Sequence, residues 1–181
     1  MKTNLSVMLL SLSMAVFLSA CSPEQNWRDL ALEGSGIKIQ LPCKPDRTTR
    51  NVTLSGVPVD LQVVGCESGS AIVAVMSAAL PPAADANAVM LFWQQATLDN
   101  AKVQPDAPMV RQVWHRPGQL PLAASVRIQA PAQRANGEAV SMDAAWGAVA
   151  EGERIRLVHA VVYDKKPPTE LATTLLEAIK P

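Results

Sequence analysis

The chain has 181 residues, of which 49% are hydrophobic and 18% charged, and its 16 basic side chains equal its 16 acidic ones. The length fits a single domain, the charge balance argues against a nucleic-acid binder, and the apolar content excludes a disordered chain. Three cysteines are also too few for a disulfide-dense miniprotein.

The N-terminus has the pattern of a secretory signal. Lys2 precedes an apolar run at residues 5–17 that is interrupted only by serines. As a helix this run would rise roughly 20 Å, which is short of the ~30 Å hydrocarbon core of a bilayer. A charged start, a short apolar run and small residues after it therefore predict an exported chain.

The residues Leu18-Ser19-Ala20-Cys21 resemble the lipobox of bacterial lipoproteins. In that family the cysteine receives a thioether-linked diacylglycerol, a peptidase cuts before it, and the freed amine is often acylated. The alternative is an ordinary signal peptide with a chance cysteine, but ordinary cleavage requires a small residue where Leu18 stands. We therefore predict lipid on Cys21, a removed signal peptide at 1–20, a short tether at 21–26 and one globular domain at 27–181.

The lipobox resemblance also implies a location. Ser22 follows the cysteine, whereas an Asp there favours retention in the inner membrane of Gram-negative bacteria. We expect a lipid-anchored protein of the bacterial cell envelope, at the outer membrane and facing the periplasm. Two or three acyl chains would hold it firmly, because one chain alone binds only reversibly. The expected partners are the membrane, through Cys21, and an envelope protein, but no nucleic acid.

The other two cysteines, Cys43 and Cys66, form an even pair in an oxidising compartment, where disulfides persist. A bridge between them would close a loop of 24 residues and contribute about 3.4 kcal/mol in the chain-entropy model. The alternatives are a metal site or a reactive thiol. A metal site at the two cysteines would need further ligands, and the candidates, His115 and His159, are not beside either cysteine in the sequence. A redox pair would favour a Cys-x-x-Cys spacing, which is absent. We therefore predict a structural disulfide.

Alternating apolar residues and turn signals predict a strand-rich mature chain. Strands are expected at residues 37–41, 47–54, 57–66, 71–80, 110–114, 122–129, 139–149 and 154–164. Ser55-Gly56 predicts a tight hairpin turn, and Gly152 predicts a second one between the last two strands. The nearly all-apolar run at 71–80 indicates a central strand.

Two helices complete the predicted order. Residues 87–101 place apolar side chains at helical spacing after a cap at Asp85 or Asn87, and residues 169–179 form an amphipathic last helix. Antiparallel hairpins with two helices predict an α+β fold, a curved antiparallel sheet of about six to eight strands.

The stretch from Ile37 to Pro45, together with the order of hairpin, helix, four-strand run and C-terminal helix, is similar to the PsbP-like fold of photosystem extrinsic subunits. Small bacterial envelope proteins share that layout. The resemblance implies a binding or assembly module without catalytic chemistry and without a cofactor.

No catalytic motif stands out in the sequence: it contains no Gly-x-Ser-x-Gly elbow, P-loop or His-Glu-x-x-His pattern. His159 alternates with Leu157 and Val161, which indicates a half-buried structural histidine more than a catalytic base. Trp114, His115 and Arg116 form a possible contact loop, with Trp114 as its surface anchor, although an ordinary loop and a core tryptophan are the plainer interpretations.

The sequence thus predicts a cellular location, a disulfide and a fold class, but no ligand. The favoured hypothesis is a non-enzymatic lipoprotein that binds or assembles near the membrane. One alternative is an accessory lipoprotein of an envelope secretion machine, for which an all-β sandwich would be the distinguishing feature. The other is a hydrolase whose site forms only in three dimensions, with His115 or His159 beside a carboxylate and a serine.

Overall fold

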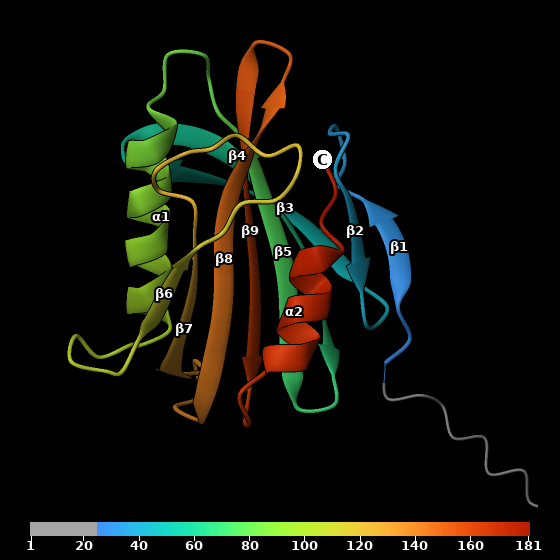
Figure 1. Ribbon diagram of the computed structural model, residues 1–181, viewed down its shortest axis with the longest axis vertical. Coiled ribbons are helices and arrows are strands. Elements are labelled where there is room, and N and C mark those ends of the chain that lie inside the picture. Colours follow the sequence, from blue (N-terminus) through green and yellow to red (C-terminus); the bar gives the residue numbers. More distant parts are fainter. Residues whose placement is uncertain (1–24) are drawn as a thin grey trace, which may run out of the picture.

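The computed structural model of the chain describes residues 25–181, so the predicted signal peptide and Cys21 lie outside the described residues. Its main feature is an open antiparallel sheet of seven strands in the order β3-β4-β5-β9-β8-β7-β6 (Figure 1). The strands of this sheet are β3 (Asp46–Leu54), β4 (Val57–Ser68), β5 (Ala71–Ala79), β6 (Val110–Val113), β7 (Val126–Gln133), β8 (Ala139–Glu151) and β9 (Arg154–Asp164). The α+β class and the predicted number of strands are confirmed.

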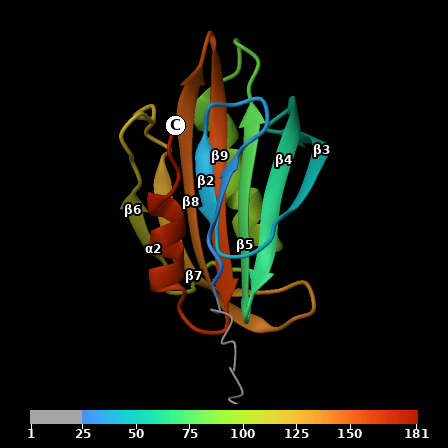
Figure 2. The same cartoon turned by 90° about the vertical axis from the view of Figure 1, so that its right-hand side faces the viewer.

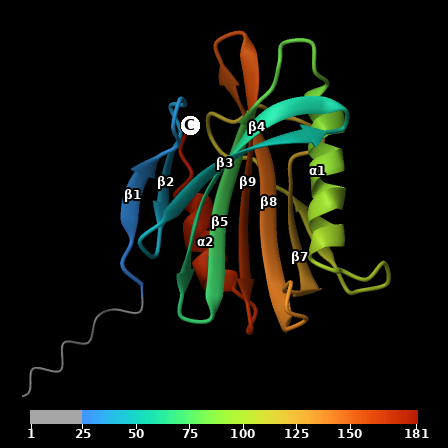
Figure 3. The ribbon, with the colours of Figure 1, turned by 180° about the vertical axis from the view of Figure 1, so that it is seen from behind.

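Both faces of the sheet are covered. Helix α1 (Ala86–Asn100) packs on one face, and helix α2 (Thr169–Glu177) lies on the other with a small hairpin of β1 (Arg28–Ala31) and β2 (Lys38–Leu41) (Figures 2 and 3). Two apolar clusters result, one around Trp93 and Trp146 under α1 and one around Leu175 and Val158 under α2. Because both faces are buried, the central strands are nearly continuous apolar runs, as the sequence at 71–80 indicated.

The hairpin of β3 and β4 turns where the sequence predicts it. Ser55 and Gly56 have φ angles of 50° and 79°, the left-handed pair that a two-residue turn between twisted strands requires. The hairpin of β8 and β9 also turns as predicted, at Gly152 with φ 59°. Helix α1 begins after Asp85, whose carboxylate accepts from the backbone N–H groups of Asn87 and Ala88.

The structure corrects the strand predicted at 122–129. Strand β7 runs from Val126 to Gln133 and passes through Pro131, which pairs with Ser141 of β8. The Ser125 carbonyl accepts from Trp114 N, and Gln133 N donates to the Ala101 carbonyl. Odd-numbered residues of β7 therefore direct their backbone groups away from β8. The pairing of β7 with β6 ends at Gln129, so Pro131 faces no β6 residue and its missing N–H removes no ladder bond.

Strand β1 is a second difference, because four residues with mixed polarity give no strand signal in the sequence. It pairs with β2 from Arg28↔Leu41 to Ala31↔Lys38. The C-terminus secures the same hairpin, since Lys38 and Lys180 exchange two backbone hydrogen bonds of 2.8 and 2.9 Å. Helix α2 is shorter than predicted because Ile179, although buried, lies in this extended C-terminal segment.

Candidate functional site

The predicted disulfide is confirmed. The Sγ atoms of Cys43 and Cys66 are 2.00 Å apart, and the Cα atoms are 5.9 Å apart. Cys43 follows β2 and Cys66 belongs to β4. The bridge therefore fastens the end of the small hairpin to the main sheet.

The predicted contact loop is only partly at the surface. Trp114 is 7% exposed and belongs to the apolar cluster under α2, so the plainer interpretation as a core tryptophan holds and Trp114 is not a surface anchor. A Cβ atom added to Gly147 would lie 2.8 Å from the Trp114 ring. Trp114 is thus buried because β8 has a glycine, Gly147, where the Trp114 ring packs against it. The sequence alone does not reveal this contact.

The rest of this loop is ordered by its own contacts. The Arg116 backbone N–H donates to the Gln119 side-chain oxygen at 3.0 Å, and the His115 Nε2 atom lies 3.0 Å from the Gln119 carbonyl. Arg116 also donates to the Glu177 carbonyl at the C-terminal end of α2, where a cation is favoured by the helix dipole. His115 remains exposed, so the loop presents one imidazole to solvent.

His159 is fully buried, which corrects the half-buried prediction. Its ring stacks on Trp146 with centroids 4.3 Å apart and meets Trp93 edge-on at 5.4 Å. Its Nδ1 atom lies 3.1 Å from the Ala145 carbonyl, which can only accept, so Nδ1 carries the proton. Burial lowers the pKa of His159 to about 4 although the Ala145 bond acts against it. Within residues 25–181, His159 bonds to no carboxylate or hydroxyl.

This depressed pKa predicts a loss of stability in acid. The unfolded chain, with a His pKa near 6.5, takes up the proton before the folded chain does. The contribution of neutral His159 to the free energy of unfolding is therefore complete above pH 6.5 and declines as the pH falls toward 4. At pH 5 we expect a loss of about 2 kcal/mol, measured by urea unfolding at pH 7.5 and pH 5.

Two variants isolate the contribution of His159. The His159→Phe variant keeps a ring against Trp146 and should lack this component of the pH dependence. His115→Gln should retain it, because His115 is exposed. An equal loss of stability in wild type and His159→Phe would show that other groups control the acid response.

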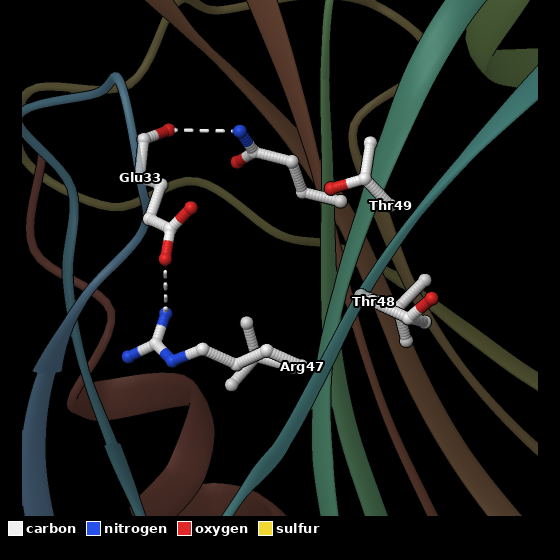
Figure 4. A pocket seen from close by; sticks show the side chains of 7 residues that line it. Glu33, Arg47, Thr48 and Thr49 are labelled. Atoms are coloured by element: carbon white, nitrogen blue, oxygen red, sulfur yellow. Dashed lines mark hydrogen bonds and ion pairs between the residues drawn. The ribbon is translucent and has the colours of Figure 1, made fainter.

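A polar cavity of about 230 Å³ lies between the turn after β1 and the surface of β3 and β4 (Figure 4). Gln62 donates to the Glu33 carbonyl at 2.9 Å, and Arg47 donates to the Ala31 carbonyl at 3.3 Å, with its guanidinium 4.0 Å from the Glu33 carboxylate. Thr48 and Thr49 complete this polar lining. Such a cavity can exchange hydrogen bonds with a small polar group. Nothing in the sequence indicates this cavity, because β1 was not predicted.

A second polar region lies at the end of the sheet where β9 stops. Glu138 accepts from Arg134 and Lys165, each at 2.8 Å, and the hydrogen bond from Lys165 is the main cause that lowers the pKa of Glu138. Two adjoining cavities of about 370 and 310 Å³ share Ser70 and Ala71 there. The cations of this region are largely occupied by carboxylates of the protein itself.

The described part of the chain offers no metal centre, since nowhere in residues 25–181 do three His, Cys, Asp or Glu side chains gather closely enough to hold an ion. No helix within the same residues is both long and apolar enough to cross a bilayer. No protein-family model matches the chain, and no curated protein matches it significantly.

Proposed function

We propose that this chain is a lipoprotein of the bacterial cell envelope, attached through lipid on Cys21, and that it binds or assembles with an envelope partner without catalysing a reaction. The lipobox-like residues Leu18 to Cys21 carry this proposal. The disulfide between Cys43 and Cys66 supports it, because disulfides persist in exported chains and are rare in reducing compartments.

The chemistry of the described residues supports a binding role over a catalytic one. A general base must reach the proton that it removes, whereas His159 is enclosed by two tryptophans. His115 is exposed, but within residues 25–181 its ring bonds to the Gln119 carbonyl and not to a carboxylate or a hydroxyl. The resemblance to the PsbP-like layout supports the same conclusion, since that layout implies binding or assembly.

Exposed apolar side chains also favour a partner. Leu91 and Phe92 on α1 are 55% and 46% exposed, and Val110 and Val113 on the short edge strand β6 are 57% and 84% exposed. Large apolar residues that stay in contact with water are common at protein interaction surfaces. They support a protein partner without identifying it.

Replacing the proposed acceptor of the lipid tests the anchor. We expect Cys21→Ser to move the protein from the membrane fraction to the soluble fraction, because the attachment depends on acyl chains and not on a membrane-spanning helix. Fractionation followed by immunoblotting measures the change, and Ser22→Ala is the matched control that should stay with membranes. Continued membrane attachment of Cys21→Ser would contradict the anchor. Crosslinking in intact envelopes, followed by pull-down, then tests whether the anchored form holds a partner.

A further inference from the structure

The point at which the chain enters the fold is fixed at one end of the sheet. The Asn26 N–H donates to the Pro42 carbonyl at 2.7 Å. Gln25 lines the 310 Å³ cavity together with Lys166, Pro167 and Leu171. The start of β1 and the turn that joins β9 to α2 therefore border one cavity, and both lie toward the same end of the sheet (Figure 2).

The length of chain before this point limits how the molecule can stand on a membrane. Four residue steps separate Cys21 from Gln25, and they span at most ~14 Å. Strand β9 extends from Arg154 to Asp164, which is roughly 33 Å at ~3.3 Å per residue. A lipid on Cys21 can therefore lie near the end of the sheet at Asp164 but cannot reach the end at Gly152.

We infer that the molecule stands on the bilayer with one end of its sheet against the headgroups, an inference that rests on the proposed lipid anchor. This anchor end consists of the β4–β5 turn, the β7–β8 connection and the β9–α2 turn, at residues 69–70, 134–138 and 165–168. The surface that it meets is the membrane that carries the lipid of Cys21.

The charges of the anchor end suit zwitterionic headgroups. Three cations, Arg134, Lys165 and Lys166, lie near four carboxylates, those of Glu67, Glu138, Asp164 and Glu170. Lys166 is exposed and makes no ion pair within residues 25–181, so its ammonium is available to a lipid phosphate. Exposed carboxylates can pair with the ammonium groups of the same lipids. The near balance of charge means that acyl chains, and not anionic lipids, supply the attachment.

This orientation determines which surfaces face the aqueous compartment. Arg156 is the third residue of β9, near the end of the sheet opposite the membrane. Because it donates to the Gly34 carbonyl, the turn after β1 lies toward that same end. The polar cavity beside Glu33 (Figure 4) lies level with the middle of β9, because its residue Gln62 pairs with Ser77, which pairs with Val158. It would then stand clear of the headgroups and be open to a soluble molecule.

Fluorescence quenching by headgroup spin labels tests the orientation in the full-length lipidated protein. Two variants, Lys166→Cys and Glu153→Cys, each add one free cysteine beside the lipidated Cys21 and the Cys43–Cys66 disulfide. Both carry the same fluorophore on the added cysteine, because both positions are exposed and mark opposite ends. The proteins are reconstituted in phosphatidylethanolamine–phosphatidylcholine vesicles that contain spin-labelled lipid. Because Lys166 lines the same cavity as Gln25, from which the tether reaches at most ~14 Å, we expect roughly twofold or greater quenching there and little at position 153.

The outcomes separate the orientation from the anchor. Protein that sediments with vesicles but is quenched equally at both positions, or more strongly at 153, overturns the orientation and leaves the anchor intact. Protein that fails to sediment with vesicles overturns the anchor and the orientation together. The soluble Cys21→Ser form with the same labels supplies the baseline, and quenching of that form at position 166 would show attachment without lipid and also overturn the inference.

Discussion

Replacing Asp143 with alanine is expected to destabilise the protein by about 3–5 kcal/mol, because it leaves a half-enclosed arginine without its counter-ion. The Asp143 side chain is 1% exposed and that of Arg127 is 15% exposed. Arg127 donates to both carboxylate oxygens, at 2.8 and 2.7 Å, and Gln129 donates to one of them at 2.6 Å. Arg127 also reaches Thr173 of α2 at 3.1 Å, so the carboxylate organises the contact between helix and sheet.

The hydrogen bond to Asp143 is the main reason that the pKa of Arg127 is raised, although burial acts in the opposite direction. Asp143→Ala removes this support, but a guanidinium remains protonated in proteins even without its partner, so the cost of the substitution is mostly that of an unpaired charge. Urea unfolding followed by circular dichroism measures the change.

Two further variants show whether the charge is the cause. Asp60→Ala removes an exposed carboxylate that accepts a hydrogen bond from Asn51 and should change stability by less than about 0.5 kcal/mol. The double variant Asp143→Leu with Arg127→Met removes both charges and should be more stable than Asp143→Ala alone. A double variant at least as unstable as the single one would attribute the loss to packing.

Removal of the disulfide is expected to cost about 3 kcal/mol, because the bridge restricts a loop between residues separated by 23 positions. The bridge also joins the end of β2 to β4, so its loss should loosen the β1–β2 hairpin before the main sheet. We expect a lower urea midpoint in the presence of reductant. Reduction should also increase the rate of hydrogen exchange more at the amides of β1 and β2 than at those of β5 and β9.

The Cys43→Ser, Cys66→Ser double variant is the matched control. Its urea midpoint should equal that of the reduced wild type and should not respond to reductant. Unchanged stability of the wild type after complete reduction, checked by thiol labelling, would show that the hairpin is held mainly by other contacts. The backbone bonds between Lys38 and Lys180 are the first of these.

The sequence predicted the elements whose signals are local. Turns and helix caps act over a few residues, so they can be recognised without knowing the fold. The examples are the left-handed pair at Ser55-Gly56, the glycine at position 152 and the cap at Asp85. The pairing of Cys43 with Cys66 could also be predicted, because one cysteine lies in a lipobox-like motif and only two remain. The predicted helix bounds differ from the observed ones by one or two residues, as fraying ends allow.

The features that the sequence could not determine depend on residues that meet only in the folded chain. Trp114 is buried because Gly147 leaves room for its ring, and His159 is enclosed because α1 brings Trp93 to the ring that Trp146 already stacks upon. The cavity beside Glu33 requires β1, a strand too short and too polar to predict. The pattern of apolar residues and turn signals thus predicted the α+β class, and the cysteine count predicted the disulfide. The tertiary structure decided which side chains lose their contact with water, because burial is set by packing between distant segments.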